Sequence, residues 1–410
     1  MRSRKGRRWL FSFLTLLLTV PLLTGCWDRL EIEERAVILG IGIDLAKPGA
    51  EKNEGSISHV KGSFPTPKGE MIMLSAQVAI PGRIPLGPGE GGGGSGGGQK
   101  PVWVISVVGH TVQDAINNLQ QELADRLFLG HLRIVVVSED FAKAGMTGLS
   151  DYMRRTPEIR RTTWVVVCED QALDLMNIAP QLERVPSLYL LATMDHAVRM
   201  GKLPNAFVGT FWIADSALGV EPFLPYVRLV DSGNMQIAGL AMFRGEKMVG
   251  HTEPLEIGVY MAMKGLNPGG YSALTNLQDK DSAITYQVTH RKARTDVAIK
   301  NGMPEFVVKI SLEGNLTEKI NEHFLLSNDE LRAIENQLVE NGLKAFNNLI
   351  KKTQEKDSDI FGFGEYVRAK EPKYWKTHIG SKENWRKMYK DVKVNVQTDF
   401  NIRRVGGKTT

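Results

Sequence analysis

Apolar residues along the first half of the chain form short buried runs separated by stretches of helical periodicity. The runs predict strands at 36–46, 71–80, 102–108, 132–137 and 162–168, the second pairing with the first as a hairpin. Between them, a helix capped by Thr111 is predicted from apolar positions 112, 115, 116, 119, 123 and 127, and Ser138 and Asp170 are predicted to cap two more. This alternation predicts an α/β domain with a partly parallel sheet over residues 26–185.

Weaker patterns follow over residues 186–272 and predict a small middle α/β domain. A helix is expected near 188–200, then a strand at 236–243, a turn at 244–247 and a helix opened by Pro254.

Residues 273–410 predict a third domain made of a sheet and one long helix. Strands are expected at 283–290, 295–300 and 306–312, and clean alternation from Val392 to Val396 predicts a final strand. Ser327 and Glu330 form a capping box that starts a helix over 328–352. The predicted fold class is therefore mixed, α+β and α/β, with three domains that each pack helices on a β-sheet.

The segment 81–100 differs from the rest because it runs through several prolines into GGGGSGGG. Such composition predicts a flexible surface insertion in the first domain. A phosphate-binding loop would lead into a helix, whereas a predicted strand follows here.

The N-terminus has the pattern of an export signal. Five basic residues precede an apolar run over 9–23 that is short for a membrane span, and the run ends in Leu23-Thr24-Gly25-Cys26. This is the pattern of a bacterial lipoprotein signal peptide over residues 1–25, cleaved after Gly25. Cys26 would then carry fatty-acyl chains of the palmitate type, and Trp27 beside it suits a bilayer interface.

Removing the signal changes the charge of the protein. The full chain carries a formal net charge of +5, and residues 1–25 hold five basic residues and no acidic one. The mature chain would be neutral overall, so the basic balance does not indicate a nucleic-acid partner. With Cys26 lipidated, Cys168 has no partner for an internal disulfide and is predicted to be a buried core residue.

Motifs for enzymatic chemistry are missing from the sequence. There is no HExxH, paired CxxC, GxSxG or P-loop, and Gly362-Phe363-Gly364 is too short for a dinucleotide fingerprint. His110 and His131 come without ligand spacing or a nucleophile. We therefore predict a protein that is not an enzyme and has no cofactor and no metal site.

Two charged segments are candidate surfaces. The first holds Arg154, Arg155, Arg160 and Arg161 among acidic residues, and it fits either a solvated helix end or a docking surface. The second, residues 370–393, carries eight Lys or Arg with interleaved aromatics. It fits either a helix packed on the last sheet or a membrane or partner surface, and the residues proposed for that surface, together with Trp27, are Lys373, Trp375, Lys376, Trp385 and Arg386.

Four blocks in fixed order give the chain a resemblance to a known family. They are GCWDRLEIEERAVILGIGID, LGHLRIVVVSEDFAK with DYMRRTPEIRRTTWVVV, AGLAMFRGEKMVG, and the ending KYWK…NWRKMYKDVKVNVQTDFNIRRVG. From Cys26 to about Gly406 the chain resembles the C-subunit lipoproteins of spore nutrient-germinant receptors, the Ger(x)C family. The loops at 47–70 and 81–100 are longer than the family pattern.

The resemblance implies a three-domain, lipid-anchored receptor subunit on the outer face of the inner membrane of an endospore. It also implies assembly with an A-type subunit and a multi-spanning B-type subunit. Lipidation outside the cytoplasm argues separately against a nucleic-acid partner. Two other classes stay open: a solute-binding lipoprotein, which would need two similar lobes around a ligand cleft, and a cell-envelope hydrolase.

Overall fold

The computed structural model describes residues 34–404 with gaps at 56, 61–63, 65–68, 81–100, 179–182, 184, 231–232, 277–282 and 320–326, and also positions 6, 9, 11 and 13–15. The predicted cleavage site at Gly25, Cys26, Trp27 and the insertion 81–100 lie outside the described residues. None of the helices in the described part of the chain is long and apolar enough to cross a membrane.

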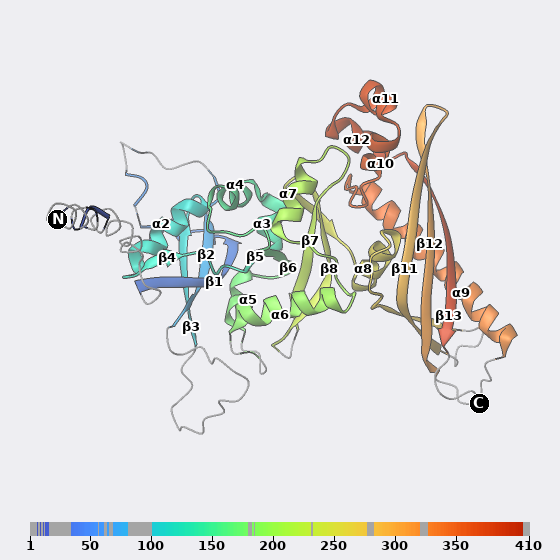
Figure 1. Ribbon diagram of the computed structural model, residues 1–410, viewed down its shortest axis with the longest axis horizontal. Helices are drawn as coiled ribbons and strands as arrows, with labels where there is room; N and C mark the ends of the chain where they lie inside the picture. The colour runs from blue at the N-terminus through green and yellow to red at the C-terminus, as the bar shows by residue number, and fades with distance from the viewer. Residues whose placement is uncertain are drawn as a thin grey trace.

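The larger of two sheets has the strand order β3-β2-β1-β5-β6-β7-β8-β9, with β4 paired to the start of β1 (Figure 1). Strands β1, β5, β6 and β7 run parallel, and the outer strands on both sides are antiparallel. The strands are β1 Arg35–Leu45, β2 Ile72–Ala79, β3 Val102–Gly109, β4 Arg126–Phe128, β5 Ile134–Ser138, β6 Trp164–Cys168, β7 Phe223–Leu229, β8 Met235–Arg244 and β9 Lys247–His251.

Helices cover both faces of this sheet, and the central strands are buried along their whole length. Consecutive residues of β5 pack into different cores: Ile134 faces the core of α5 and α6, whereas Val135 faces the core of α2, α3, α4 and α7. Burial on both faces explains their continuous apolar sequence. The helices are α2 Val112–Glu122, α3 Glu139–Ala144, α4 Thr147–Arg155, α5 Ala172–Asn177, α6 Pro186–Arg199, α7 Val208–Ser216 and α8 Pro254–Met263.

Two of the three predicted helix caps in this region are confirmed, and one is wrong. Thr111 Oγ accepts the N–H of Asp114, and Ser138 Oγ accepts that of Phe141. At α5, however, the carboxylate of Asp44 accepts the N–H groups of residues 172 and 173, at 2.7 and 3.1 Å, so Asp170 does not cap this helix. Asp44 stands near the end of β1, where the sheet brings it to a helix that starts 128 residues later.

The middle segment continues the same sheet. Strands β7, β8 and β9 all lie within the segment 186–272 and hydrogen-bond onto β6 through β7. The mixed α/β fold class is confirmed, while the domain boundaries at 185/186 and 272/273 stay a prediction.

The C-terminal sheet has the order β10-β11-β12-β13, with β13 parallel to β12. The expectation of three strands over 283–312 is wrong, because β11 and β12 form one long hairpin around the turn at Asn301-Gly302. The basic run around 291–294 hides the strand pattern, since β11 alternates between exposed and half-buried positions from 292 onward. The strands are β10 Ser272–Asn276, β11 Ala283–Lys300, β12 Met303–Lys319 and β13 Lys393–Arg404.

One long helix, α9, packs across this sheet, and three short helices follow it (Figure 1). Its capping box is confirmed: Ser327 Oγ accepts the Glu330 N–H, and the Glu330 carboxylate accepts that of Ser327. The helices are α9 Asn328–Glu355, α10 Phe363–Lys370, α11 Pro372–Tyr374 and α12 Lys382–Tyr389, with a π-helical turn η4 Trp375–Ile379; a 3-10 turn η3 Ala50–Asn53 lies earlier in the chain.

A buried carboxylate joins the larger sheet to these C-terminal helices. Glu221, just before β7, accepts two hydrogen bonds from Arg386 of α12, at 2.6 and 3.2 Å, and one from the Gly245 N–H at 2.7 Å. Lys382 Nζ lies 3.6 Å from the same carboxylate and donates to the main-chain carbonyls of Ala214 and Asp215. We call this set, Glu221 with Arg386 and Lys382, the junction cluster.

Close backbone contact surrounds the junction cluster. A Cβ atom on Gly219 would lie 2.3 Å from the carbonyl carbon of Gly364, so only glycine fits at this contact. The buried Asp359 carboxylate accepts the N–H groups of Gly362 and Gly364 and the indole N–H of Trp385, at 2.9 to 3.0 Å. Gly362-Phe363-Gly364 is thus a packing element of the junction.

Asp359 predicts a pH dependence of folding stability. Burial raises the pKa of its carboxyl from 3.8 to about 6, although hydrogen bonds from the main chain and Trp385 oppose the shift. The folded chain therefore holds this proton more tightly, and the resulting stabilisation is full below about pH 3.8 and lost as the pH rises through about 6. Urea unfolding should show that the difference in unfolding free energy, wild type minus Asp359→Asn, falls between about pH 4 and 7. Parallel pH curves for the two proteins would contradict this origin.

Candidate functional site

The four arginines of the predicted docking surface separate into two pairs. Arg155 forms an ion pair with Asp151 in its own helix, and Arg154 lies 3.4 Å from Asp215 and over the ring of Trp212. Arg160 and Arg161 lie in the loop before β6, and their side chains are exposed. Among the described residues neither of the latter forms an ion pair, so these two guanidinium groups are available to a partner.

The structure corrects the aromatic part of the second predicted surface. Trp375 and Trp385 are buried, at 6% and 1% exposure, and their rings pack against each other in the core. Arg386 belongs to the junction cluster. The structure therefore shows that these two tryptophans are core residues. A buried tryptophan contributes a large apolar area, and its indole N–H usually finds a hydrogen-bond acceptor.

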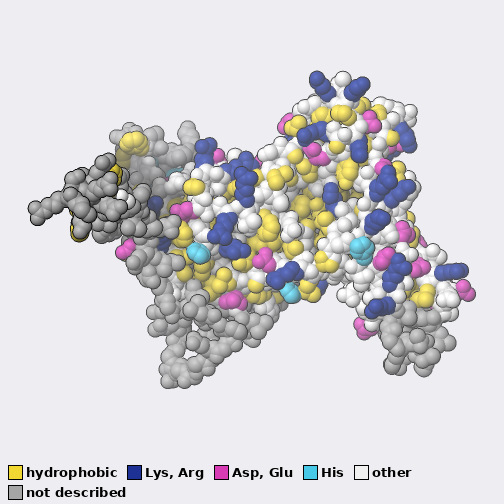
Figure 2. All heavy atoms as spheres, in the orientation of Figure 1, with side chains coloured by type: hydrophobic (Ala, Val, Ile, Leu, Met, Phe, Trp, Pro, Cys, Tyr) yellow, Lys and Arg dark blue, Asp and Glu magenta, His cyan; other side chains and the backbone are white. Residues whose placement is uncertain are grey.

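Lys373 and Lys376 are the exposed members of that predicted surface. They lie at the tip formed by α11 and η4, and Figure 2 shows Lys and Arg side chains gathered around this tip. A role for these two lysines at a membrane or partner surface stays a prediction.

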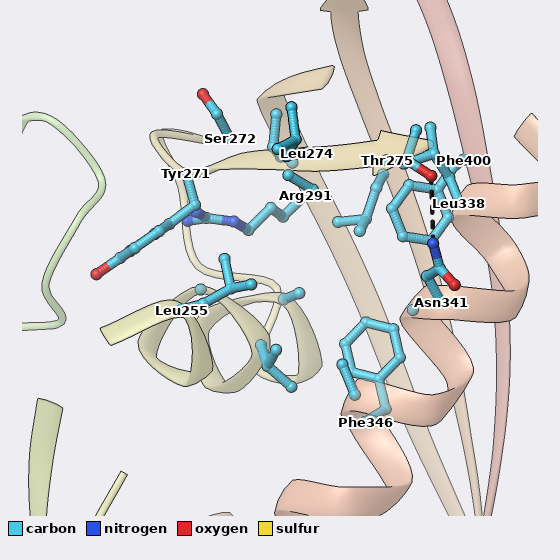
Figure 3. Close-up of a pocket in the computed structure, with 18 residues that line it drawn as sticks. Leu255, Tyr271, Ser272, Leu274, Thr275, Arg291, Leu338, Asn341, Phe346 and Phe400 are labelled. Carbon is cyan, nitrogen blue, oxygen red and sulfur yellow. Dashed lines mark hydrogen bonds between the residues drawn. The ribbon is translucent and has the colours of Figure 1, made fainter. Parts of the chain in front are cut away.

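A cavity of about 170 Å³ lies in the C-terminal part of the molecule, between α8, β10 and α9 (Figure 3). Its walls are mostly apolar, with contributions from Leu255, Leu338, Phe346 and Phe400. Asn341 donates to Thr275 Oγ1 at 3.2 Å across one end. Among its described lining residues there is no histidine, cysteine or carboxylate, and the mostly apolar walls suit an apolar side chain or small molecule.

Arg291 also lines the cavity, but its guanidinium group has a structural role. Its guanidinium donates to the main-chain carbonyls of Gly201, Leu266 and Pro268, at 3.0 to 3.2 Å. Burial lowers its pKa to about 10. These contacts hold the loop after α8 against the end of α6, which explains an arginine buried without a carboxylate partner in the described part of the chain.

Two further findings concern reactive groups. Cys168 is confirmed as a buried core residue, and burial raises the pKa of its thiol to about 12, so it stays a thiol at neutral pH. His110, which showed no ligand spacing in the sequence, lies beside Glu54 and His59. Sequence reasoning missed this group because its members are separated by about 50 residues and two belong to a loop. A polar Glu-x₄-His pair inside that loop is the only signal it offers.

The comparisons with known proteins agree across nearly the whole chain. Residues 28–229 match the model described as the spore germination protein N-terminal domain, and residues 238–406 match that described as spore germination B3/GerAC like, C-terminal. The crystal structure of the GerBC protein is similar in fold, with a TM-score of 0.53 at 16% identity over 82% of this chain and 95% of that chain.

Relatives in Bacillus subtilis (strain 168) align from end to end. Spore germination protein KC is 27% identical over 95% of this chain and 94% of its own length. The putative spore germination protein YfkR is 24% identical over 98% of both chains. Since both domain models match in order and together cover most of the sequence, the chain belongs to the Ger(x)C family of spore germination proteins, the C-subunit family of germinant receptors.

Proposed function

We propose that the chain is a lipid-anchored, non-enzymatic subunit of a germinant receptor. It would be held by Cys26 at the outer face of the spore inner membrane and would assemble there with an A-type and a multi-spanning B-type subunit. The observation that carries the proposal is the sequence Leu23-Thr24-Gly25-Cys26, because the spore germination domain match begins at residue 28, directly after the predicted lipid-bearing cysteine.

The short tether limits how far the folded body stands from the membrane. Arg35, the first residue of β1, lies nine positions after Cys26 in the sequence. A fully extended chain covers at most about 3.6 Å per residue, so the start of β1 lies within roughly 32 Å of the lipid anchor. The proposed anchor would therefore keep the edge of the sheet where β1 begins close to the bilayer.

That same edge carries the two available arginines. Strands β1, β5 and β6 are parallel, so all three begin at one edge of the sheet. Arg160 and Arg161 precede β6, which lies two strands away from β1, or roughly 10 Å. The anchor and the arginines thus point to one membrane-proximal edge as the docking surface for the other receptor subunits.

Direct capture of a solute, the alternative left open by the sequence, has less support. A solute-binding lipoprotein would enclose its ligand between two similar lobes. Here the cavity lies inside the C-terminal part, between α8, α9 and β10, and the two sheets differ in size and strand order. We therefore place the response to nutrients in the assembled receptor.

Spores lacking the gene should lose one nutrient response. Nutrient-triggered release of dipicolinic acid should be abolished or strongly slowed, while release by a non-nutrient trigger stays normal. Cys26→Ala should give a matching defect, with the protein lost from the membrane fraction on an immunoblot. Normal responses to every nutrient, in a strain from which other germinant receptors have been removed, would overturn the proposal.

Charge reversal at the membrane-proximal edge should impair the receptor without unfolding the subunit. Arg160→Glu with Arg161→Glu should slow nutrient-triggered release at least several-fold, because the attraction between these arginines and the partner subunit is replaced by repulsion. Lys344→Glu with Lys351→Glu, an equal change of charge on the exposed face of α9, is the control and should have little effect. Equal responses in the two strains, at equal protein levels, would place the docking surface elsewhere.

A further inference from the structure

Three side chains from distant parts of the sequence meet at one end of the larger sheet. Glu54 ends the 3-10 turn η3, His59 follows in the same loop, and His110 stands between β3 and α2. Their ligand atoms all lie within 4.8 Å of one another. We call these three residues the histidine cluster.

The fold fixes His110 in this place. A Cβ on Gly109 would lie 2.6 Å from the backbone nitrogen of Ala115, so glycine is what allows β3 to run directly into α2. The His110 N–H donates to Asp114 Oδ2 at 2.9 Å. The other oxygen of Asp114 accepts the hydroxyl of Ser58, the residue before His59. One buried carboxylate thus holds the His110 backbone and the Ser58 side chain, each next to or part of a member of the cluster.

The distances within the histidine cluster match a shared coordination sphere. Glu54 Oε1 lies 3.3 Å from His110 Nε2, and Glu54 Oε2 lies 3.4 Å from His59 Nε2. Two ligands about 2.05 Å from a tetrahedral zinc ion are ~3.3 Å apart. The glutamate presents one oxygen to each imidazole, and one ligand atom from each of the three side chains lies within 4.8 Å of the other two.

Hydrogen bonding does not account for these contacts. The side chains of Glu54 and His110 are 5% and 10% exposed, yet Glu54 Oε1 and His110 Nε2 have no hydrogen-bond partner in the described structure, despite lying 3.3 Å apart. A buried polar atom left unpaired costs about 1–3 kcal/mol, so such atoms require an explanation. A cation that accepts both lone pairs supplies one.

We propose that the histidine cluster binds one divalent transition-metal ion of the Zn²⁺ type. Two imidazole nitrogens with one carboxylate are a donor set for zinc and its neighbours in the transition series, whereas Mg²⁺ and Ca²⁺ prefer all-oxygen sites. Three protein ligands leave a fourth position for water or for a group from a partner. The ion fastens the loop between β1 and β2 onto the start of α2.

Metal titration of the full chain tests the site. The protein, purified in detergent, stripped with EDTA and dialysed, should bind one equivalent of Zn²⁺ by calorimetry, undisturbed by excess Mg²⁺ or Ca²⁺. His59→Gln and His110→Gln should each weaken binding by more than the roughly 10- to 100-fold that outer-shell changes cost. His131→Gln is the matched control, because this exposed histidine lies outside the cluster and should leave the affinity unchanged.

Two measurements on the unaltered chain keep the test independent of how the variants fold. Co²⁺ should give the intense visible absorption of a four-coordinate site, and Zn²⁺ should slow proteolysis within residues 46–71. Substoichiometric binding, a six-coordinate cobalt spectrum, or equal zinc affinity in the His59→Gln, His110→Gln and His131→Gln proteins would overturn the proposal. Each of these outcomes leaves the germination experiments unaffected, so the two proposals fail separately.

Discussion

The buried carboxylate of Glu221 is the contact on which the arrangement of the molecule depends. It receives a two-pronged hydrogen bond from Arg386 and lies beside the ammonium group of Lys382, so the larger sheet and the C-terminal helices share one ionic centre. Removing one partner of such a buried pair costs about 3–5 kcal/mol, a large fraction of the stability of an ordinary domain. At Gly219 and Gly364 the two main chains also lie in direct contact, and a side chain at either position would prevent this contact. The two sheets therefore hold a fixed relation to each other.

A fixed relation between the sheets gives the molecule two structurally different ends. The parallel strands β1, β5 and β6 begin at the edge closest to the predicted anchor, and that edge presents Arg160 and Arg161. The long hairpin of β11 and β12 and the helix α9 lie at the other end of the body (Figure 1). Under the proposed function, such a subunit would contact membrane-embedded partners at one end and present a second sheet, with its apolar cavity, away from the proposed anchor.

The sequence predicted the elements that depend on neighbouring residues. The capping box at Ser327 and the strands β1, β2, β3, β5 and β6 were predicted correctly, because propensity and periodicity are local. One error is local, since the polar run in the middle of β11 hides a continuous strand. The others involve partners distant in sequence: Asp44, and not Asp170, caps α5, and of the two roles open to Trp385 the core position holds because its indole N–H donates to buried Asp359. The histidine cluster was missed for the same reason, since no local pattern connects Glu54 with His110.

Rigidity also limits how this subunit can take part in signalling. A ligand or partner shifts a conformational equilibrium only by its difference in affinity for the two states. A change that separated the two sheets would expose Glu221 and its cationic partners and would have to overcome the cost of breaking the pair. Under the proposed function, movement of the whole body on its tether would change no buried contact. The subunit would then act as one rigid piece, and a nutrient signal would alter what the edge nearest the proposed anchor contacts rather than how the core is packed.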